Sequence, residues 1–177
     1  MGKWAMYRRR GSHHTPGELV PVLLQSSAAS CGQEEVVAAG FLGLALRLDA
    51  PASFTVQALE LQLRRSAGFA QTTTAQIWLD QGDGNAPFSI LGSSAAVPAA
   101  SVPTALGVVR YEGLSVPITN GQDYWVIIRA AAVVGANELF WGGDTSAGRL
   151  MNMNSLSGFS LSSTLRARCV DVFGQLG

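Results

Sequence analysis

Beyond residue 14 the sequence contains no histidine, because its only two are His13 and His14. Serine and cysteine nucleophiles commonly need a histidine base, and many zinc sites use histidine ligands. Most of the chain therefore lacks the side chains for a Ser–His or Cys–His system and for a His-ligated zinc site. We expect a protein that is not an enzyme and that needs no cofactor.

Cysteine is also scarce, because Cys31 and Cys169 are the only two and they lie far apart. They do not form the C-x-x-C spacing of redox and zinc motifs. The sequence favours two buried or half-buried thiols. A disulfide between them stays open as the alternative, because nothing in the sequence requires it.

Long apolar runs are missing as well. No stretch reaches the roughly 18 apolar residues of a membrane-spanning helix, so we expect no contact with a membrane. The N-terminus does not resemble a secretory leader, because Glu18 and Pro21 interrupt the short apolar run from Leu19 to Leu24. We therefore expect a protein that is made in the cytoplasm and does not leave it by the general secretory route.

Positive charge is concentrated at the N-terminus. Residues 1–17 carry four basic residues and no acid, whereas the whole chain has 12 basic and 12 acidic residues. The remaining chain thus has a net charge of −4, from eight basic and 12 acidic residues. We expect residues 1–33 to form an extended arm, because Pro16, Gly17 and Pro21 prevent a long helix. Residues 34–177 are expected to form one folded domain.

Aromatic residues are mixed with the charges of this arm. Compact aromatic anchors and arginines are typical of protein interfaces, and nucleic acid is a weaker candidate because only four charges are present on an otherwise acidic chain. We predict that the arm docks on a partner protein. The predicted partner-binding residues are Lys3, Trp4, Tyr7, Arg8, Arg9 and Arg10.

Alternating apolar and polar residues dominate the rest of the chain. Leu59, Leu61 and Leu63 alternate with polar residues, as in a strand with one buried face. Similar runs predict further strands within 36–48, 75–80, 88–91, 108–111, 124–128, 139–141 and 165–173. Roughly eight strands at this spacing predict an all-β antiparallel β-sandwich or jelly roll. The expected core residues are Leu59, Leu61, Leu63, Ile77, Leu79, Val126 and Ile128.

Two features of this region are candidate sites. Trp78 falls on the polar face of its strand, where an exposed ring would stack on a sugar or pack on a neighbouring subunit. Asp80, Asp83 and Asn85 offer the oxygen ligands that Ca²⁺ prefers. Their spacing does not complete an EF-hand loop, so an ordinary turn is favoured and no metal is expected. Trp125 and Trp141 are expected in the core.

A series of motifs then carries a resemblance. In order, these are Leu59–Leu63, Ile77-Trp78-Leu79-Asp80, the loop 82–87, Ile90-Leu91-Gly92-Ser93-Ser94, Val116-Pro117-Ile118, the segment 120–128 and Trp141. Over residues 40–173 this order resembles the jelly-roll β-sandwich modules of secreted bacterial surface proteins and of tailed-phage virion proteins. In those modules a G-x-x-Y-W strand follows a Pro turn, as Gly121-Gln122-Asp123-Tyr124-Trp125 follows Pro117 here.

The resemblance implies a function. The secreted members carry a leader and often a C-terminal anchor, which we do not recognise here, so the virion members are favoured. We expect a non-enzymatic structural protein, a head decoration, fibre-base or tail-associated protein, assembled into the virion in the host cytoplasm. Its partners would be other virion subunits and further copies of itself. A carbohydrate-binding β-sandwich module is the alternative, in which Trp78 would contact a glycan.

Overall fold

The computed structural model describes most of the chain. Its described residues are 21–26, 31, 33–36, 43–80, 82, 87–131, 138–143, 150–153, 159–161 and 168–176. The predicted docking residues Lys3, Trp4, Tyr7, Arg8, Arg9 and Arg10 lie outside them, as do Asp83 and Asn85. Among the described residues, no helix has the length and apolar character needed to cross a bilayer.

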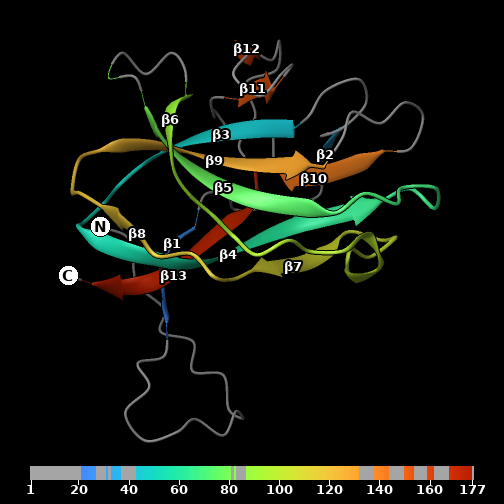
Figure 1. The fold of residues 1–177 in the computed structure, drawn as a ribbon, viewed down its shortest axis with the longest axis horizontal. Coiled ribbons are helices and arrows are strands. Elements are labelled where there is room, and N and C mark those ends of the chain that lie inside the picture. Colours follow the sequence, from blue (N-terminus) through green and yellow to red (C-terminus); the bar gives the residue numbers. More distant parts are fainter. Residues whose placement is uncertain are drawn as a thin grey trace, which may run out of the picture.

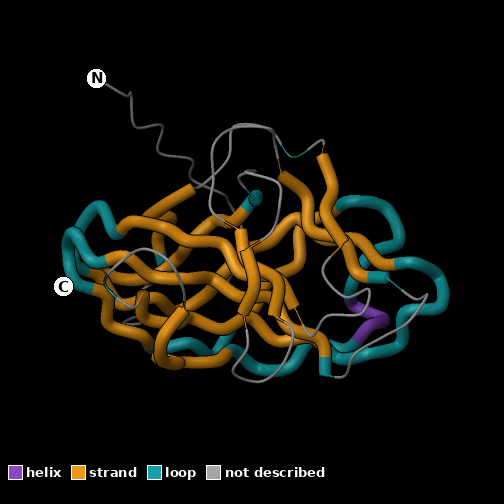
Figure 2. Tube along the Cα trace, turned by 90° about the horizontal axis from the view of Figure 1, so that it is seen from above, coloured by secondary structure: helices purple, strands orange, loops and turns teal. Residues whose placement is uncertain are grey.

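The described chain is an antiparallel β-sandwich of two sheets, which confirms the predicted fold class (Figure 1). Sheet A contains β1 (Val22–Ser26), β2 (Gln33–Val36), β4 (Phe54–Arg65), β7 (Gly107–Tyr111), β8 (Val116–Ile118), β10 (Leu139–Gly143) and β13 (Val170–Leu176). Sheet B contains β3 (Gly43–Asp49), β5 (Thr73–Asp80), β6 (Pro87–Ser93), β9 (Asp123–Ala130), β11 (Leu150–Met153) and β12 (Phe159–Leu161). Apart from a single 3-10 turn, Ala99–Ser101, the described elements are strands (Figure 2).

The longest strand, β4, organises sheet A. Its first two-thirds pair with β13 and its last residues with β10 on one edge, while β7 and β8 pair with the other edge. Sheet B has the order β12-β11-β3-β9-β5-β6, so β9 lies between β3 and β5. Strands far apart in the sequence thereby lie side by side, as β13 and β4 do in Figure 1.

The core between the sheets follows the alternation seen in the sequence. Six of the seven expected core residues are fully buried, and only Leu79 remains half-buried. Leu79 lies next to an irregularity in the pairing of β5 with β6, near the end of the strand, which explains its partial exposure. Thr73 and Tyr111 join the two sheets through a 2.7 Å hydrogen bond between their hydroxyl groups. Trp141 is buried in this core, as predicted, whereas Trp125 is fully buried on the other face of sheet B.

A tight turn follows β8 at Asn120-Gly121. The Gln122 amide donates to the Thr119 carbonyl at 3.0 Å, and Gly121 has a φ of +75°, which favours glycine. A long connection joins β6, which ends at Ser93, to β7, which begins at Gly107. The two short strands β11 and β12 were not expected.

Several boundaries differ from the sequence prediction. Residues 22–26, expected within the arm, form β1, and Leu24 enters the core because β1 pairs with β13. The strand expected from residue 165 begins at Val170 among the described residues. Arg168, directly before this strand, is fully buried, and its guanidinium donates a hydrogen bond to the Trp141 carbonyl at 2.9 Å.

Candidate functional site

The outer face of sheet B carries a polar cluster. The pairing of β9 with β3 and β5 places Trp125 opposite both Arg47 and Trp78, on the side of the sheet away from the core. Trp125 is nevertheless fully buried, and so is Ile127 on the same face. Sheet B thus buries large apolar side chains on both of its faces.

Asp80 lies at the centre of this cluster. Its side chain is 2 % exposed. One carboxylate oxygen accepts from the indole N–H of Trp125 at 2.7 Å and the other from the Gly82 amide at 2.9 Å. Arg47 approaches it at 3.8 Å. In this structure Asp80 therefore binds both the indole of Trp125 and the backbone amide of Gly82. No group of three or more metal-ligating side chains occurs within the described ranges.

Arg47 also contacts two further carboxylates. Asp49 and Asp123 are directly opposite each other on β3 and β9, and the Arg47 guanidinium contacts both, pairing closely with Asp123. A shared hydrogen bond with Asp123, together with partial burial and the charge of Asp123, raises the pKa of Asp49. The same hydrogen bond and the contact with Arg47 lower the pKa of Asp123. The geometry places two opposed carboxyl groups beside one arginine, with the pKa of Asp49 raised and that of Asp123 lowered.

Trp78 is half-buried, not exposed as expected. Its indole N–H donates to the Gln76 side-chain oxygen at 3.1 Å, and its cross-strand neighbour on β6 is Ile90. The edge strand β6 beyond it exposes large apolar side chains. Phe88 is 64 % exposed, Ile90 50 % and Leu91 39 %. Phe88 and Leu91 are the extra residues at the two irregularities of the β5–β6 ladder.

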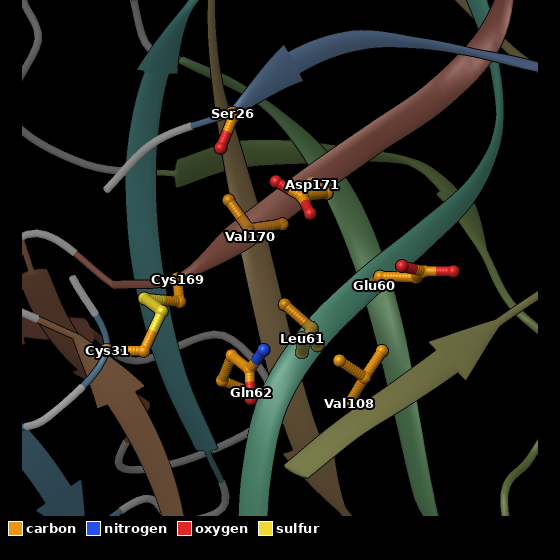
Figure 3. Close-up of a pocket in the computed structure, with 9 residues that line it drawn as sticks. All are labelled: Ser26, Cys31, Glu60, Leu61, Gln62, Val108, Cys169, Val170 and Asp171. Carbon is orange, nitrogen blue, oxygen red and sulfur yellow. A yellow bond between two sulfur atoms is a disulfide. The ribbon is translucent and has the colours of Figure 1, made fainter. Parts of the chain in front are cut away.

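The outer face of sheet A contains a small hollow of about 130 Å³ (Figure 3). Strands β1, β4, β7 and β13 and the two cysteines surround it. Its lining residues are Ser26, Cys31, Glu60, Leu61, Gln62, Val108, Cys169, Val170 and Asp171. The carboxylates of Glu60 and Asp171 belong to residues directly opposite each other on β4 and β13.

Cys31 and Cys169 form a disulfide at this hollow, so the favoured interpretation as two thiols is wrong (Figure 3). Their Cα atoms are 5.8 Å apart although the two cysteines are 138 positions apart in sequence. The pairing of β1 and β2 into sheet A brings them together, because Cys31 lies between these strands and Cys169 lies directly before β13. This long-range pairing cannot be read from the spacing of the two cysteines.

The structure brings together only part of the predicted sites. Trp78 and Asp80 lie on one face of β5, whereas the other candidate residues lie outside the described ranges. Arg47 and Asp49 were not predicted as site residues. The segment around them is mostly apolar, so the alternation of Leu44, Leu46 and Leu48 with less apolar residues was not apparent. The hollow was missed because its two carboxylates are 111 positions apart in sequence, at residues 60 and 171. The chain matches no protein-family model and no curated protein sequence.

Proposed function

We propose that this chain is a non-enzymatic structural protein of a tailed-phage virion, a head decoration, fibre-base or tail-associated subunit. Its basic N-terminal arm attaches it to neighbouring virion subunits during assembly in the host cytoplasm. The observation that carries the proposal is the apolar surface of β6, formed by Phe88, Ile90 and Leu91. Neighbouring exposed apolar side chains of this size mark protein contacts.

The shape of β6 indicates how such a contact forms. Irregular pairing disturbs an edge strand as a template for a further strand. Strand β6 has two such irregularities and places Phe88 and Leu91 at them. A partner therefore docks against these side chains, without extending sheet B.

The disulfide supports a particle that functions outside the cell. Disulfides persist in oxidising surroundings and are rare in reducing cytoplasm. Cys31–Cys169 joins the region between β1 and β2 to the start of β13. A released virion meets oxidising conditions, in which this bond stabilises the sandwich after assembly.

The test is incorporation into particles. Purified particles from a culture that makes the full chain are analysed by quantitative mass spectrometry, and we expect this chain at a fixed copy number. Phe88→Ser with Leu91→Ser should reduce the copy number. Leu23→Ser is the control and should not reduce it, because Leu23 lies on β1 of the other sheet and is 51 % exposed. A chain that is found only in the free-protein fraction contradicts the proposal.

The arm is tested in the same experiment. Replacing Arg8, Arg9 and Arg10 by Ala should lower incorporation in a salt-dependent way, because exposed charge pairs are screened by salt. Unchanged incorporation would assign attachment to the sandwich alone.

Carbohydrate binding is the second candidate, supported by the half-buried Trp78 beside Ile90. Aromatic rings next to polar side chains such as Gln76 provide stacking and hydrogen bonding. A glycan array separates the two functions. A signal that Trp78→Ala abolishes supports the carbohydrate module, and a blank array leaves the virion proposal in place.

A further inference from the structure

The hollow on sheet A has the size of a side-chain pocket. Its volume is about 130 Å³, whereas pockets for small-molecule ligands have about 300–1,000 Å³. It holds the equivalent of about four water molecules. Pockets that receive single anchoring side chains are typical of protein interfaces.

The charge of the hollow selects a cationic occupant. Glu60 is already paired with Arg110 on β7 at 3.0 Å. Asp171 is half-buried and has no ion pair within the described part of the chain. The two acidic residues are directly opposite each other in the β4–β13 ladder, so a positive group close to both would relieve the repulsion between them.

The rim of the hollow adds an apolar surface. Val108, on β7 opposite Gln62 of β4, is an apolar residue whose side chain is 55 % exposed at the rim. The disulfide borders another part of the hollow (Figure 3). An occupant that combines positive charge with apolar or aromatic groups complements this lining.

We infer that this hollow receives the basic arm of a second copy of the chain. The inference rests on the proposed function, and it identifies the acceptor of the arm. Residues 1–17 have a charge of +4 and contain Trp4 and Tyr7, whereas the rest of the chain has a charge of −4. Charge complementarity between arm and body thus leads to self-assembly.

The direction of β1 favours a second copy over the chain's own arm. Ser26 lines the hollow, opposite Asp171, whereas Val22 is opposite Gly174 at the far end of the strand. The chain therefore enters β1 from the end that points away from the hollow. Its own arm would have to reverse direction to reach the pocket, and a neighbour's arm has no such constraint.

Charge exchange between two full-length variants tests the inference. One variant carries Asp171→Lys in the hollow, and the other carries Arg8→Glu, Arg9→Glu and Arg10→Glu in the arm. Self-association is measured by sedimentation velocity at low and at physiological salt. Each change should weaken it at least about tenfold, because like charges then face each other. An equimolar mixture of the two variants should restore association, because opposite charges again meet between different chains.

Two controls keep the result interpretable. Asp49→Lys reverses an exposed charge on sheet B and should leave self-association unchanged. Asp171→Asn removes the charge with little change in shape and should weaken association less than Asp171→Lys, while thermal melting verifies that each variant is folded.

Three outcomes overturn the inference. These are a monomeric wild-type chain, an Asp171→Lys variant that associates like wild type, and a mixture that stays dissociated. If these occur while the arginine replacements still lower incorporation into particles, the arm docks on a different subunit and the proposed function stands.

Discussion

The two outer faces of the sandwich differ in how their charged side chains are paired. On sheet B, Arg47 contacts Asp49, Asp80 and Asp123, and Asp80 also binds the buried indole of Trp125. On sheet A, the described residues leave Asp171 without an ion pair at the edge of a hollow. On the first face one arginine contacts three carboxylates, whereas on the second face Asp171 is the carboxylate that we propose is available to another molecule.

This difference distinguishes structural from interaction surfaces. A carboxylate that is buried and accepts two hydrogen bonds, such as Asp80, contributes mainly to the fold. The half-buried Asp171 remains accessible to a partner, as does the exposed Val108 near it. We expect substitution of Asp171 to change the free energy of unfolding only slightly. Substitutions on the two faces should therefore separate stability from association.

The largest expected effect comes from breaking the disulfide beside the hollow. A cross-link that closes a loop of this length restricts the unfolded chain, and its loss costs up to about 5 kcal/mol of unfolding free energy in the chain-entropy model. Cys31→Ser with Cys169→Ser should therefore lower the denaturation midpoint markedly. Urea denaturation measures the change, and the reduced wild-type protein provides the control. A midpoint equal to that of the oxidised protein would contradict a stabilising bond.

The next effect concerns the core that supports both faces. Leu61 is fully buried in β4, so Leu61→Ala should lower the unfolding free energy by about 2–5 kcal/mol through lost burial and a residual cavity. Chemical denaturation of Leu61→Ala measures this loss, with Leu23→Ser at the exposed edge as a control of small effect. A loss below about 0.5 kcal/mol would show that Leu61 is not a packed core residue.

The sequence predicted the strands and the core better than either outer face. Strict alternation around Leu61 identifies a buried face because successive side chains of a strand point to opposite sides. The contacts of Arg47 and the pairing of Cys31 with Cys169 depend instead on which strands become neighbours. Register between distant strands is a property of the complete sandwich, so no local pattern reveals it.

The two faces are compared directly by a matched pair of substitutions. Asp80→Ala removes the acceptor of the buried Trp125 indole, and an unsatisfied buried donor costs about 1–3 kcal/mol. Asp171→Ala, on the other face, should change the unfolding free energy by less than about 0.5 kcal/mol. Denaturant titration of both variants measures the difference. Equal losses would mean that Asp171 is also structural, and the distinction between the faces would fail.

The smallest effect is a pH dependence at the carboxyl pair on sheet B. The pKa of Asp49 is raised above its ordinary value of 3.8, chiefly by its hydrogen bond with Asp123. Its stabilising contribution is therefore complete below the ordinary pKa and is lost as the pH rises through the raised one. Asp123, whose pKa is lowered, stays ionised across that range, and its own contribution is lost only at more acidic pH.

Asp49→Asn isolates this contribution, because the amide donates a hydrogen bond to Asp123 at every pH. Melting temperatures of wild type and variant are compared from about pH 4 to about pH 7, a range that begins near the ordinary carboxyl pKa. Wild type should lose stability relative to Asp49→Asn as the pH rises. The change should be small, because the Asp49 side chain is 78 % exposed and solvent screens its charge. Leu23→Ser, which changes no ionisable group, serves as the control, since its difference from wild type should not follow this dependence. A difference between wild type and Asp49→Asn that stays constant, or that grows in favour of wild type at higher pH, would show that the two carboxyl groups do not share a proton.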